Sequence, residues 1–174
     1  MITIVDDLEA ISQLETGELQ IETERFDICA LAKDVADAQE MKATAKGIML
    51  SLPEDSKSIF VFADRFRIRQ VLVNLIVNSV KYGKEYGETK IRFHDGGENI
   101  IVEIADNGIG IEKEHLPRLF ERFYRVDKSR SREQGGTGLG LAIVKHIIEA
   151  HNQTINVMST EGAGTVFSFT LKKG

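Results

Sequence analysis

A glycine-rich segment that runs directly into an amphipathic helix constrains this chain more than any other feature. Residues 135–151 read GGTGLGLAIVKHIIEAH, with glycines at positions 135, 136, 138 and 140. Glycine lets the backbone approach a ligand closely and adopt positive φ without a Cβ penalty. A helix that begins there points unpaired N–H groups and its positive dipole end toward that ligand, so phosphate is the expected guest.

Neither common glycine signature for phosphate fits this segment. A P-loop needs Lys and then Ser or Thr after its last glycine, and this pair is missing. The G-x-G-x-x-G register also breaks, because Leu141 or Ile143 stands where the third glycine should be. The segment therefore indicates a nucleotide site of a different design.

Composition narrows the classes of protein to which the chain can belong. Its 174 residues, 42% of them hydrophobic, predict one domain with a full core and a short appendage. The net charge of −5 disfavours nucleic acid as a partner. The single cysteine, Cys29, excludes an intramolecular disulfide and is expected to be a small core residue. No apolar run approaches the roughly 18 residues that span a bilayer, so we expect a soluble cytoplasmic domain without membrane contact.

The apolar pattern predicts intermixed helices and strands. Ile4, Leu8 and Ile11 form one stripe of a helix over residues 1–16 that ends at Gly17. This stripe packs either on a helix outside the chain or back onto the domain. Further helices are expected at 28–46, 64–82 and after the glycine-rich segment, and strands at 19–28, 48–52, 58–63, 90–95, 99–106, 154–160 and 165–171. The expected fold class is α+β, a two-layer sandwich whose mixed sheet is covered on one face by helices.

The helix over 64–82 carries a polar stripe that is unusual for a surface. Its apolar side is expected to hold Val73, Ile76, Val77 and Val80, with Leu72 and Leu75 beside them; the other stripe holds Arg67, Gln70, Asn74, Asn78, Lys81 and Tyr82. Asparagine is a poor interior helix former, so two of them one turn apart indicate a polar partner. Amide oxygens suit Mg²⁺, Lys81 could neutralise phosphate, and Tyr82 could lie against a base or sugar. A solvated asparagine face is the alternative.

Residues 105–111, ADNGIGI, follow an apolar strand and offer a second ligand-binding feature. The Asp106 carboxylate can accept a hydrogen bond from an exocyclic amine such as that of adenine. Gly108 and Gly110 are expected to leave room for a planar ring. An ordinary Asx turn is the alternative, because Asp-Asn-Gly is a strong turn sequence.

Residues 116–134 are basic inside an acidic chain. Six Arg or Lys residues and three acids give this stretch a net charge of +3, and Phe120, Phe123 and Tyr124 are interleaved with them. Flanking glycines make it typical of a flexible lid, over about 108–136, that closes on a polyanion. A solvated loop with anchoring aromatics and a site for single-stranded nucleic acid are the alternatives, and the acidic remainder disfavours the second.

Together these segments resemble the catalytic, ATP-binding domain of bacterial sensor histidine kinases, within the gyrase, heat-shock chaperone and mismatch-repair ATPase superfamily. NLIVNSVKYG resembles the N box, DNGIGI the G1 box, LFERFYRVD the F box and GGTGLGLAIVK the G2 box. The resemblance covers about residues 18–174, and residues 1–17 resemble the end of the dimerisation helical hairpin and its linker. It implies ATP and Mg²⁺ bound between the N-box helix and the lid.

The resemblance also implies roles for individual residues. Asn78 would bind Mg²⁺, Lys81 would bind the phosphates with Arg125 close by, and Tyr82 would flank the adenine or ribose. Asp106 would read the adenine amino group, assisted by Thr165. The predicted catalytic set is Asn74, Asn78, Lys81 and Arg125. The predicted ATP-binding set comprises Asn78, Lys81, Tyr82, Asp106, Gly108, Gly110, Ile111, Phe120, Gly136, Thr137, Gly138, Leu139, Gly140, Leu141 and Thr165.

The chain departs from the family pattern in three places. The phosphoacceptor motif, His followed by Glu, is missing, and the histidines all lie inside the ATP-binding unit: His94, His115, His146 and His151. The usual Gly-Gly after His151 is Asn152-Gln153, and asparagine tolerates the left-handed conformation that the turn needs. Ser79 replaces the usual alanine without an expected consequence.

Asn74 bears on the reaction class. Hydrolases of the superfamily carry a water-activating glutamate at this position, and an amide cannot supply the general-base contribution of about 10²–10⁴-fold. The resemblance therefore implies phosphoryl transfer to a histidine of a dimerisation domain upstream of this chain, for relay to a response regulator receiver domain. The isolated domain is expected to be monomeric and its parent homodimeric. An ATP-hydrolysing machine, a nucleotide-sensing or partner-binding module and an anti-sigma-type serine kinase are the alternatives.

Overall fold

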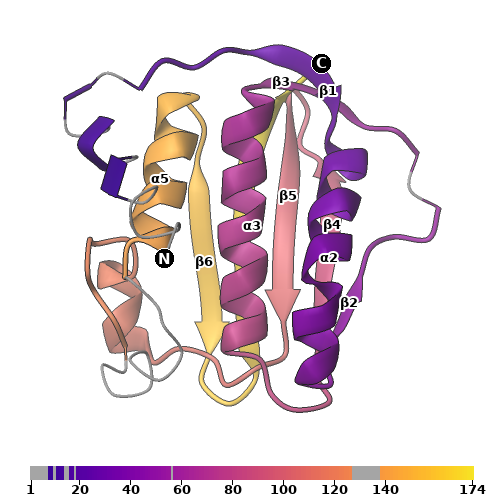
Figure 1. Ribbon diagram of the computed structural model, residues 1–174, viewed down its shortest axis with the longest axis vertical. Coiled ribbons are helices and arrows are strands. Elements are labelled where there is room, and N and C mark those ends of the chain that lie inside the picture. The colour runs from indigo at the N-terminus through magenta and orange to yellow at the C-terminus, as the bar shows by residue number, and fades with distance from the viewer. Residues whose placement is uncertain (1–7, 10, 14–15, 18, 56, 127–137) are drawn as a thin grey trace.

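The computed structural model describes residues 8–9, 11–13, 16–17, 19–55, 57–126 and 138–174. They form two layers, with helices lying side by side on one face of a single sheet (Figure 1). The expected α+β class, a mixed sheet with helices on one face, is confirmed.

The sheet contains seven strands within the described residues. These are β1 (Glu24–Asp27), β2 (Met49–Ser51), β3 (Phe60–Ala63), β4 (Glu88–Asp95), β5 (Asn99–Asp106), β6 (Ile155–Thr160) and β7 (Gly164–Lys173). Their order is β1-β3-β7-β5-β4-β2, and β6 also pairs with β7. The β2–β4 pair is parallel and the other pairs are antiparallel. The expected hairpin between β4 and β5 turns at Gly96-Gly97, where Gly97 adopts φ +90°.

Three long helices form the second layer: α2 (Ile28–Ala45), α3 (Arg65–Lys81) and α5 (Gly140–Ala150). Aspartates cap the first two: the Asp27 carboxylate accepts N–H bonds from the first turn of α2, and Asp64 does the same for α3. A short 3₁₀ helix, η1 (Lys113–Arg118), precedes the F-box segment. At the end of α5, Asn152 adopts φ +56°, the left-handed conformation expected of it.

The core lies between the helices and the inner face of the sheet. Residues of β5 and β7 alternate between buried and half-buried, and α3 buries Ile68, Val71, Leu72, Leu75, Ile76, Ser79 and Val80. The predicted apolar side of α3 was partly wrong, because Val77 is 37% exposed. At 100° per residue the buried arc is centred near Ile68 and Ser79, and Val77 lies almost opposite that centre, next to Gln70 of the polar stripe.

The N-terminal segment contacts the start of α3. Ile11 is buried in the main core cluster, whereas Leu8 is about half exposed. The Arg67 guanidinium donates to the side-chain oxygen of Gln13 at 2.9 Å. This part of the chain therefore follows the alternative in which the apolar stripe folds back onto the domain; Ile4 lies outside the described residues.

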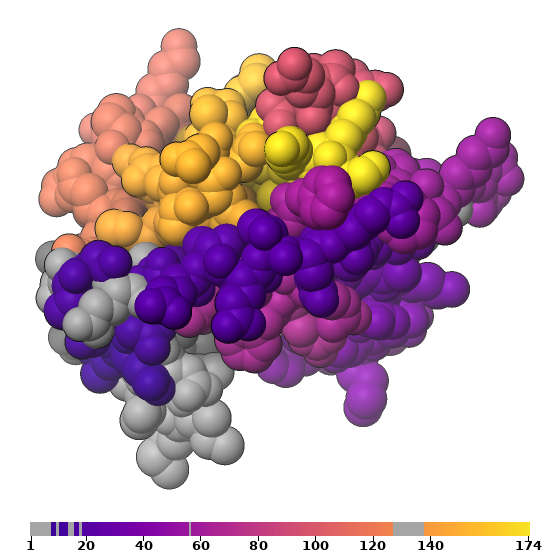
Figure 2. All heavy atoms as spheres, turned by 90° about the horizontal axis from the view of Figure 1, so that it is seen from above, coloured from indigo at the N-terminus to yellow at the C-terminus, as the bar shows by residue number. Residues whose placement is uncertain are grey.

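From the N-terminal helix the chain crosses the end of the helix layer toward β1, which begins at Glu24 rather than at the predicted residue 19 (Figure 2). On this path the backbone N–H of Glu22 donates to the Asp64 carboxylate at 3.0 Å. Within the described part of the chain, no helix combines the length and apolar character that crossing a membrane requires.

Candidate functional site

The two asparagines of α3 differ in their contacts. The Asn74 amide nitrogen donates to the carbonyl of Gly140, the first residue of α5, at 3.2 Å. Among the described residues, the half-buried side chain of Asn78 makes no hydrogen bond. Asn74 therefore ties α3 to α5, while the Asn78 amide oxygen remains available as a hard ligand of the kind that Mg²⁺ accepts.

Lys81 lies one turn after Asn78 on α3 and is affected by the charge of Arg125. Burial lowers the pKa of the Lys81 ammonium, and the nearby positive charge of Arg125 lowers it further. The Lys81 ammonium also lies 5.4 Å from the centre of the Tyr82 ring. Within the described residues, neither Lys81 nor Arg125 forms an ion pair with a carboxylate. An anion between them would relieve both the desolvation and the repulsion, so this position suits phosphate.

The C-terminal end of α3 is held by a residue that the sequence analysis did not single out. The Lys46 ammonium donates to the carbonyls of Val80 at 2.9 Å and Lys81 at 2.7 Å. A cation at this end satisfies the last carbonyls and complements the helix dipole. Lys46 thereby fixes the turn that carries Lys81 and Tyr82. Helix periodicity carries no signal for a contact between residues 35 positions apart.

Ser79, expected to have no consequence, joins α3 to the sheet. Its hydroxyl lies 3.0 Å from the hydroxyl of Thr89 on β4 and also donates to the Ile76 carbonyl. Both Ser79 and Thr89 are buried. The pair satisfies two buried hydroxyls and fixes the height of the N-box helix over the sheet.

Asp106 ends β5 and faces a partly desolvated position. Burial raises the pKa of its carboxyl group, and hydrogen bonds from the N–H groups of Gly108 and Thr165 lower it in part. The Gly108 bond, 2.9 Å long, forms the Asx turn that the sequence offered as an alternative. Thr165 pairs with Asp106 across β5 and β7, while its hydroxyl contacts Ser159 at 2.8 Å. A carboxylate held in this way gains from a further N–H donor, such as an adenine amino group.

The glycines of the G1 segment have a packing role. A Cβ on Gly108 would collide with the carbonyl oxygen of Tyr82, and one on Gly110 with the backbone of Thr160. Gly110 also has φ +71°. These glycines bring the loop onto the end of α3 and onto the β6–β7 hairpin, and the space that they were expected to leave for a planar ring stays a prediction.

Several other residues of the predicted ATP-binding set pack against the core or bond to the sheet next to the site. Phe120 packs edge-to-face on Phe167 of the inner sheet, with ring centres 6.3 Å apart. The Ile111 N–H donates to the Ser159 hydroxyl at 2.8 Å. Leu139 is buried and Leu141 packs against the same core. Gly136 and Thr137 lie outside the described residues, as does the part of the predicted lid beyond Val126.

Gly138 of the G2 segment lies against Phe123 and Arg125 of the F-box segment. The Phe123 N–H donates to the Gly138 carbonyl at 2.9 Å. Gly138 has φ +75°, and a Cβ there would lie 2.9 Å from the Phe123 Cα and 3.3 Å from the Arg125 Nε. Arg125 is thereby placed close to the N-terminus of α5, where the N-cap residue Leu139 supplies no side-chain capping hydrogen bond.

A separate surface cavity of about 500 Å³ lies on the acidic side of the G1 segment. Its lining residues are Ile111, Glu112, Lys113, Glu114, Ser159, Thr160 and Glu161. A hydrogen bond from Glu114 and the charge of Glu161 raise the pKa of Glu112. Three glutamates repel phosphate, and Asn78, Lys81 and Asp106 do not line this cavity, so it is not the phosphate site.

Known proteins match this chain in sequence and in fold. Residues 63–174 match the family described as histidine kinase-, DNA gyrase B-, and HSP90-like ATPase. The sensor protein kinase WalK of Staphylococcus aureus is 39% identical over 175 residues, which cover 98% of this chain and 41% of WalK. The chain thus spans less than half the length of that relative.

Solved structures agree with the sequence match. ShkA, solved full-length in complex with AMPPNP, shares 28% identity at a TM-score of 0.85, over 99% of this chain and 36% of ShkA. Histidine kinase ThkA, solved in complex with response regulator protein TrrA, shares 26% identity at a TM-score of 0.76, over 99% of this chain and 49% of that one. The chain therefore belongs to the histidine kinase-, DNA gyrase B-, and HSP90-like ATPase family, as the catalytic, ATP-binding domain of a sensor histidine kinase.

Proposed function

We propose that this domain binds ATP with Mg²⁺ and donates the γ-phosphoryl group to a histidine of an upstream dimerisation domain. One observation carries the proposal. The charge of Arg125 lowers the pKa of Lys81, neither residue pairs with a carboxylate among the described residues, and Asn78 lies one turn before Lys81 on α3. Such an arrangement is unfavourable when empty and favourable around a triphosphate.

Each proposed site residue would contact a different part of the magnesium nucleotide. Asn78 would hold Mg²⁺, which supplies charge that offsets the triphosphate when it is bound. Lys81, Arg125 and the N-terminus of α5 would contact phosphate oxygens, and Asp106 would accept a hydrogen bond from the adenine amino group. An imidazole nitrogen then attacks the γ-phosphorus, and the bond to the oxygen bridging the β- and γ-phosphates breaks, which releases ADP. The protein contributes positioning and charge neutralisation.

Asn74 supports transfer rather than hydrolysis. Its amide nitrogen is committed to the Gly140 carbonyl, and an amide is not a base that could activate water. The superfamily alternative, an ATP-hydrolysing machine, would need a base that this position does not supply.

The acceptor histidine is expected from outside this chain. His151 is held between two backbone groups, because its Nε2 accepts the Asp64 N–H at 3.0 Å and its Nδ1 contacts the Ile147 carbonyl at 2.7 Å. His115 contacts Tyr124, and His94 pairs with Glu103 at 3.0 Å. These three histidines have structural partners rather than the free imidazole that a phosphoacceptor needs.

The partners follow from the same proposal. The dimerisation domain of the parent kinase supplies the acceptor histidine, and a response regulator receiver domain takes the phosphoryl group from it. The complex of ThkA with the response regulator protein TrrA supports this second step. The parent would be a homodimer, whereas the isolated domain would be monomeric.

Incubation with γ-labelled ATP and Mg²⁺ tests the proposal. The chain is mixed with the dimerisation domain of its own parent, and a variant of that domain with its histidine replaced by glutamine serves as the control. Acid-labile label is expected on the dimerisation domain and none on the control or on this chain. Acid-stable label would indicate a serine kinase, and phosphate release independent of the added domain would indicate a hydrolase; either result would overturn the proposal.

A further inference from the structure

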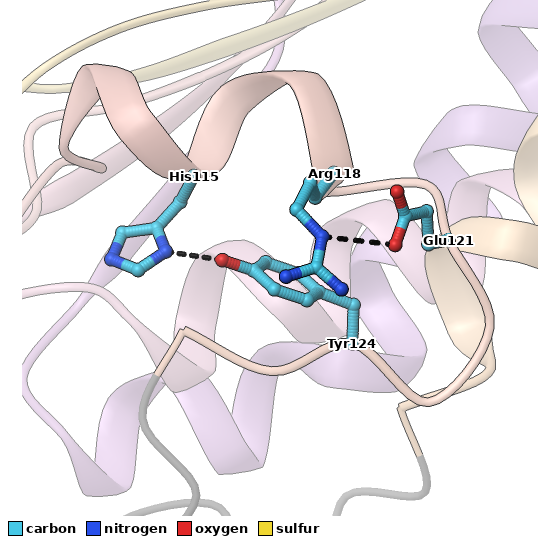
Figure 3. A network of polar contacts seen from close by, with 4 residues as sticks. All are labelled: His115, Arg118, Glu121 and Tyr124. Carbon is cyan, nitrogen blue, oxygen red and sulfur yellow. Dashed lines mark hydrogen bonds and ion pairs between the residues drawn. The ribbon is translucent and has the colours of Figure 1, made fainter.

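Tyr124 is held at two points by the 3₁₀ helix η1. Its hydroxyl is hydrogen-bonded to the Nδ1 of His115, and the Arg118 guanidinium lies 4.5 Å from the centre of its ring (Figure 3). Arg118 is itself oriented by Glu121, whose carboxylate accepts from the Arg118 Nε at 3.1 Å. A half-buried tyrosine with both its hydroxyl and its ring face engaged has little freedom to move.

The helix that holds Tyr124 is attached to the domain core. Leu119, which directly follows η1, is buried in the main core cluster, and Leu116 packs against the same cluster. Pro117 lies inside η1 and fixes the backbone there. The position of the Tyr124 side chain is therefore tied to the core through η1.

Tyr124 lies between two residues with defined positions. The preceding Phe123 is hydrogen-bonded through its N–H to the Gly138 carbonyl, and it adopts φ +61°, a conformation that non-glycine residues rarely take. The following residue is Arg125, whose Nε would lie 3.3 Å from a Cβ on Gly138 and whose charge lowers the pKa of Lys81. The backbone leading to Arg125 is thus fixed on one side by Gly138 and on the other by η1.

The attachment of Tyr124 to η1 counteracts the repulsion between Arg125 and Lys81. Without nucleotide, the repulsion between Arg125 and Lys81 favours any conformation that moves the guanidinium away. A guanidinium that must already be in place when phosphate arrives therefore needs contacts elsewhere in the chain to hold it. The hydrogen bond between His115 and Tyr124 is such a contact, because it lies one residue from Arg125 and involves neither cation.

We propose that His115 and Tyr124 are positioning residues that hold Arg125 beside Lys81 in the phosphate site. The proposal rests on the proposed function, since it assigns Arg125 to the nucleotide phosphates. Neither residue touches the nucleotide; both act through the backbone of Tyr124. Their contribution is specific to the phosphates, because Asp106 reads the base from the end of β5.

Tyr124→Phe tests the proposal with the smallest change, since the ring and its contact with Arg118 stay. Calorimetric affinities for Mg²⁺-ATP and for adenosine are compared with those of the native chain. Loss of one hydrogen bond is expected to weaken Mg²⁺-ATP binding by roughly three- to tenfold and to leave adenosine unchanged. Tyr86→Phe is the matched control, because Tyr86 is 84% exposed and lies outside the site; its affinities should equal those of the native chain.

A double-substitution cycle separates positioning from general structural support. Tyr124→Phe should have no further effect on Mg²⁺-ATP affinity in a chain that already carries Arg125→Ala, because the group that it positions is gone. His115→Ala should weaken binding as Tyr124→Phe does. His115→Asn should bind Mg²⁺-ATP with nearly the native affinity, since the asparagine amide can occupy the place of the His115 Nδ1.

Three results would overturn the inference: unchanged Mg²⁺-ATP affinity in Tyr124→Phe, an equal loss of adenosine affinity, or independent effects of Tyr124→Phe and Arg125→Ala. These results are distinct from failure of the proposed function. If the native chain binds no ATP, the proposed function fails and the inference fails with it. If the native chain binds ATP and Tyr124→Phe binds equally well, the inference alone is wrong.

Discussion

The helix α3 and the segment 107–126 face the same proposed ligand but are held by different forces. α3 is buried along half its circumference, capped by Asp64 at its start and held by Lys46 at its end. The segment 107–126 exposes large apolar side chains, among them Phe123 at 63%, and side-chain contacts such as that of Tyr124 with His115 hold it. Under the proposed function, α3 would present the metal ligand and one phosphate-binding cation from a buried, capped helix, and the segment 107–126 would present the other cation from a more exposed region.

From this comparison we expect substitutions on α3 and in the segment 107–126 to differ in whether they affect stability as well as binding. Changes that loosen α3 should lower the free energy of unfolding together with binding. Changes in the segment 107–126 should alter phosphate affinity with little effect on stability, because that segment contributes less to the core.

The largest expected effect on binding comes from Asn78→Ala. We expect Mg²⁺-dependent ATP affinity to fall about a hundredfold or more, which is about 2.7 kcal/mol, because the amide is the assigned ligand of the ion. Stability should hardly change, since the side chain makes no hydrogen bond among the described residues. Calorimetry with Mg²⁺ and with a chelator, together with thermal unfolding, measures both. Asn156→Ala, on the exposed side of β6, is the control, and equal affinities of the two variants would contradict the assignment.

Lys46→Met should be the most damaging change to stability on the α3 side. Two close carbonyl oxygens lose a charged donor, which is expected to cost about 1–3 kcal/mol. Nucleotide affinity should fall with it, because the turn that carries Lys81 and Tyr82 is released. Urea unfolding and calorimetry check the two effects, with Lys33→Met on the exposed face of α2 as control. A variant as stable as the control would show that α3 does not depend on this contact.

Asp106 should give opposite pH dependences for stability and for binding. Because burial raises its pKa above the ordinary 3.8, its contribution to stability is fully present below that value. The contribution is lost as pH rises through the raised pKa. ATP affinity should rise over the same range, since the carboxylate is the form that accepts the adenine N–H.

Asp106→Asn should remove both slopes and weaken ATP binding about tenfold. Urea unfolding and calorimetry at a series of pH values test this. Retention of the native binding slope in the variant would assign the titration to another group.

The smallest effect is expected at Cys29. Burial raises the pKa of its thiol to about 11, so at pH 8 only on the order of one molecule in a thousand carries the reactive thiolate. A thiol reagent should therefore label Cys29 only when α2 opens and should leave ATP binding intact. A cysteine introduced by Val126→Cys, at an exposed position of the opposite segment, should react far faster. Equal rates at the two positions would contradict the difference in rigidity between the two sides.

Local patterns predicted the elements and the polar stripe of α3, because helix periodicity and aspartate caps act within a few residues. Val77 was placed on the apolar side because its side chain is apolar, although at 100° per residue it lies opposite the buried Leu75 and Ser79. The contacts of Lys46 with Val80 and of Ser79 with Thr89 join distant parts of the chain, and their geometry exists only after folding. Roles for Asn78, Lys81, Asp106 and Arg125 came from matching motifs, and these roles stay predictions until ligand binding is measured.

A calorimetric titration of the purified chain with ATP, in the presence and in the absence of Mg²⁺, tests whether the site around Asn78 holds a magnesium nucleotide. Saturable heat with one nucleotide per chain is expected, and binding should be clearly weaker when Mg²⁺ is removed. No binding heat in either condition, or binding that Mg²⁺ leaves unchanged, would contradict this expectation.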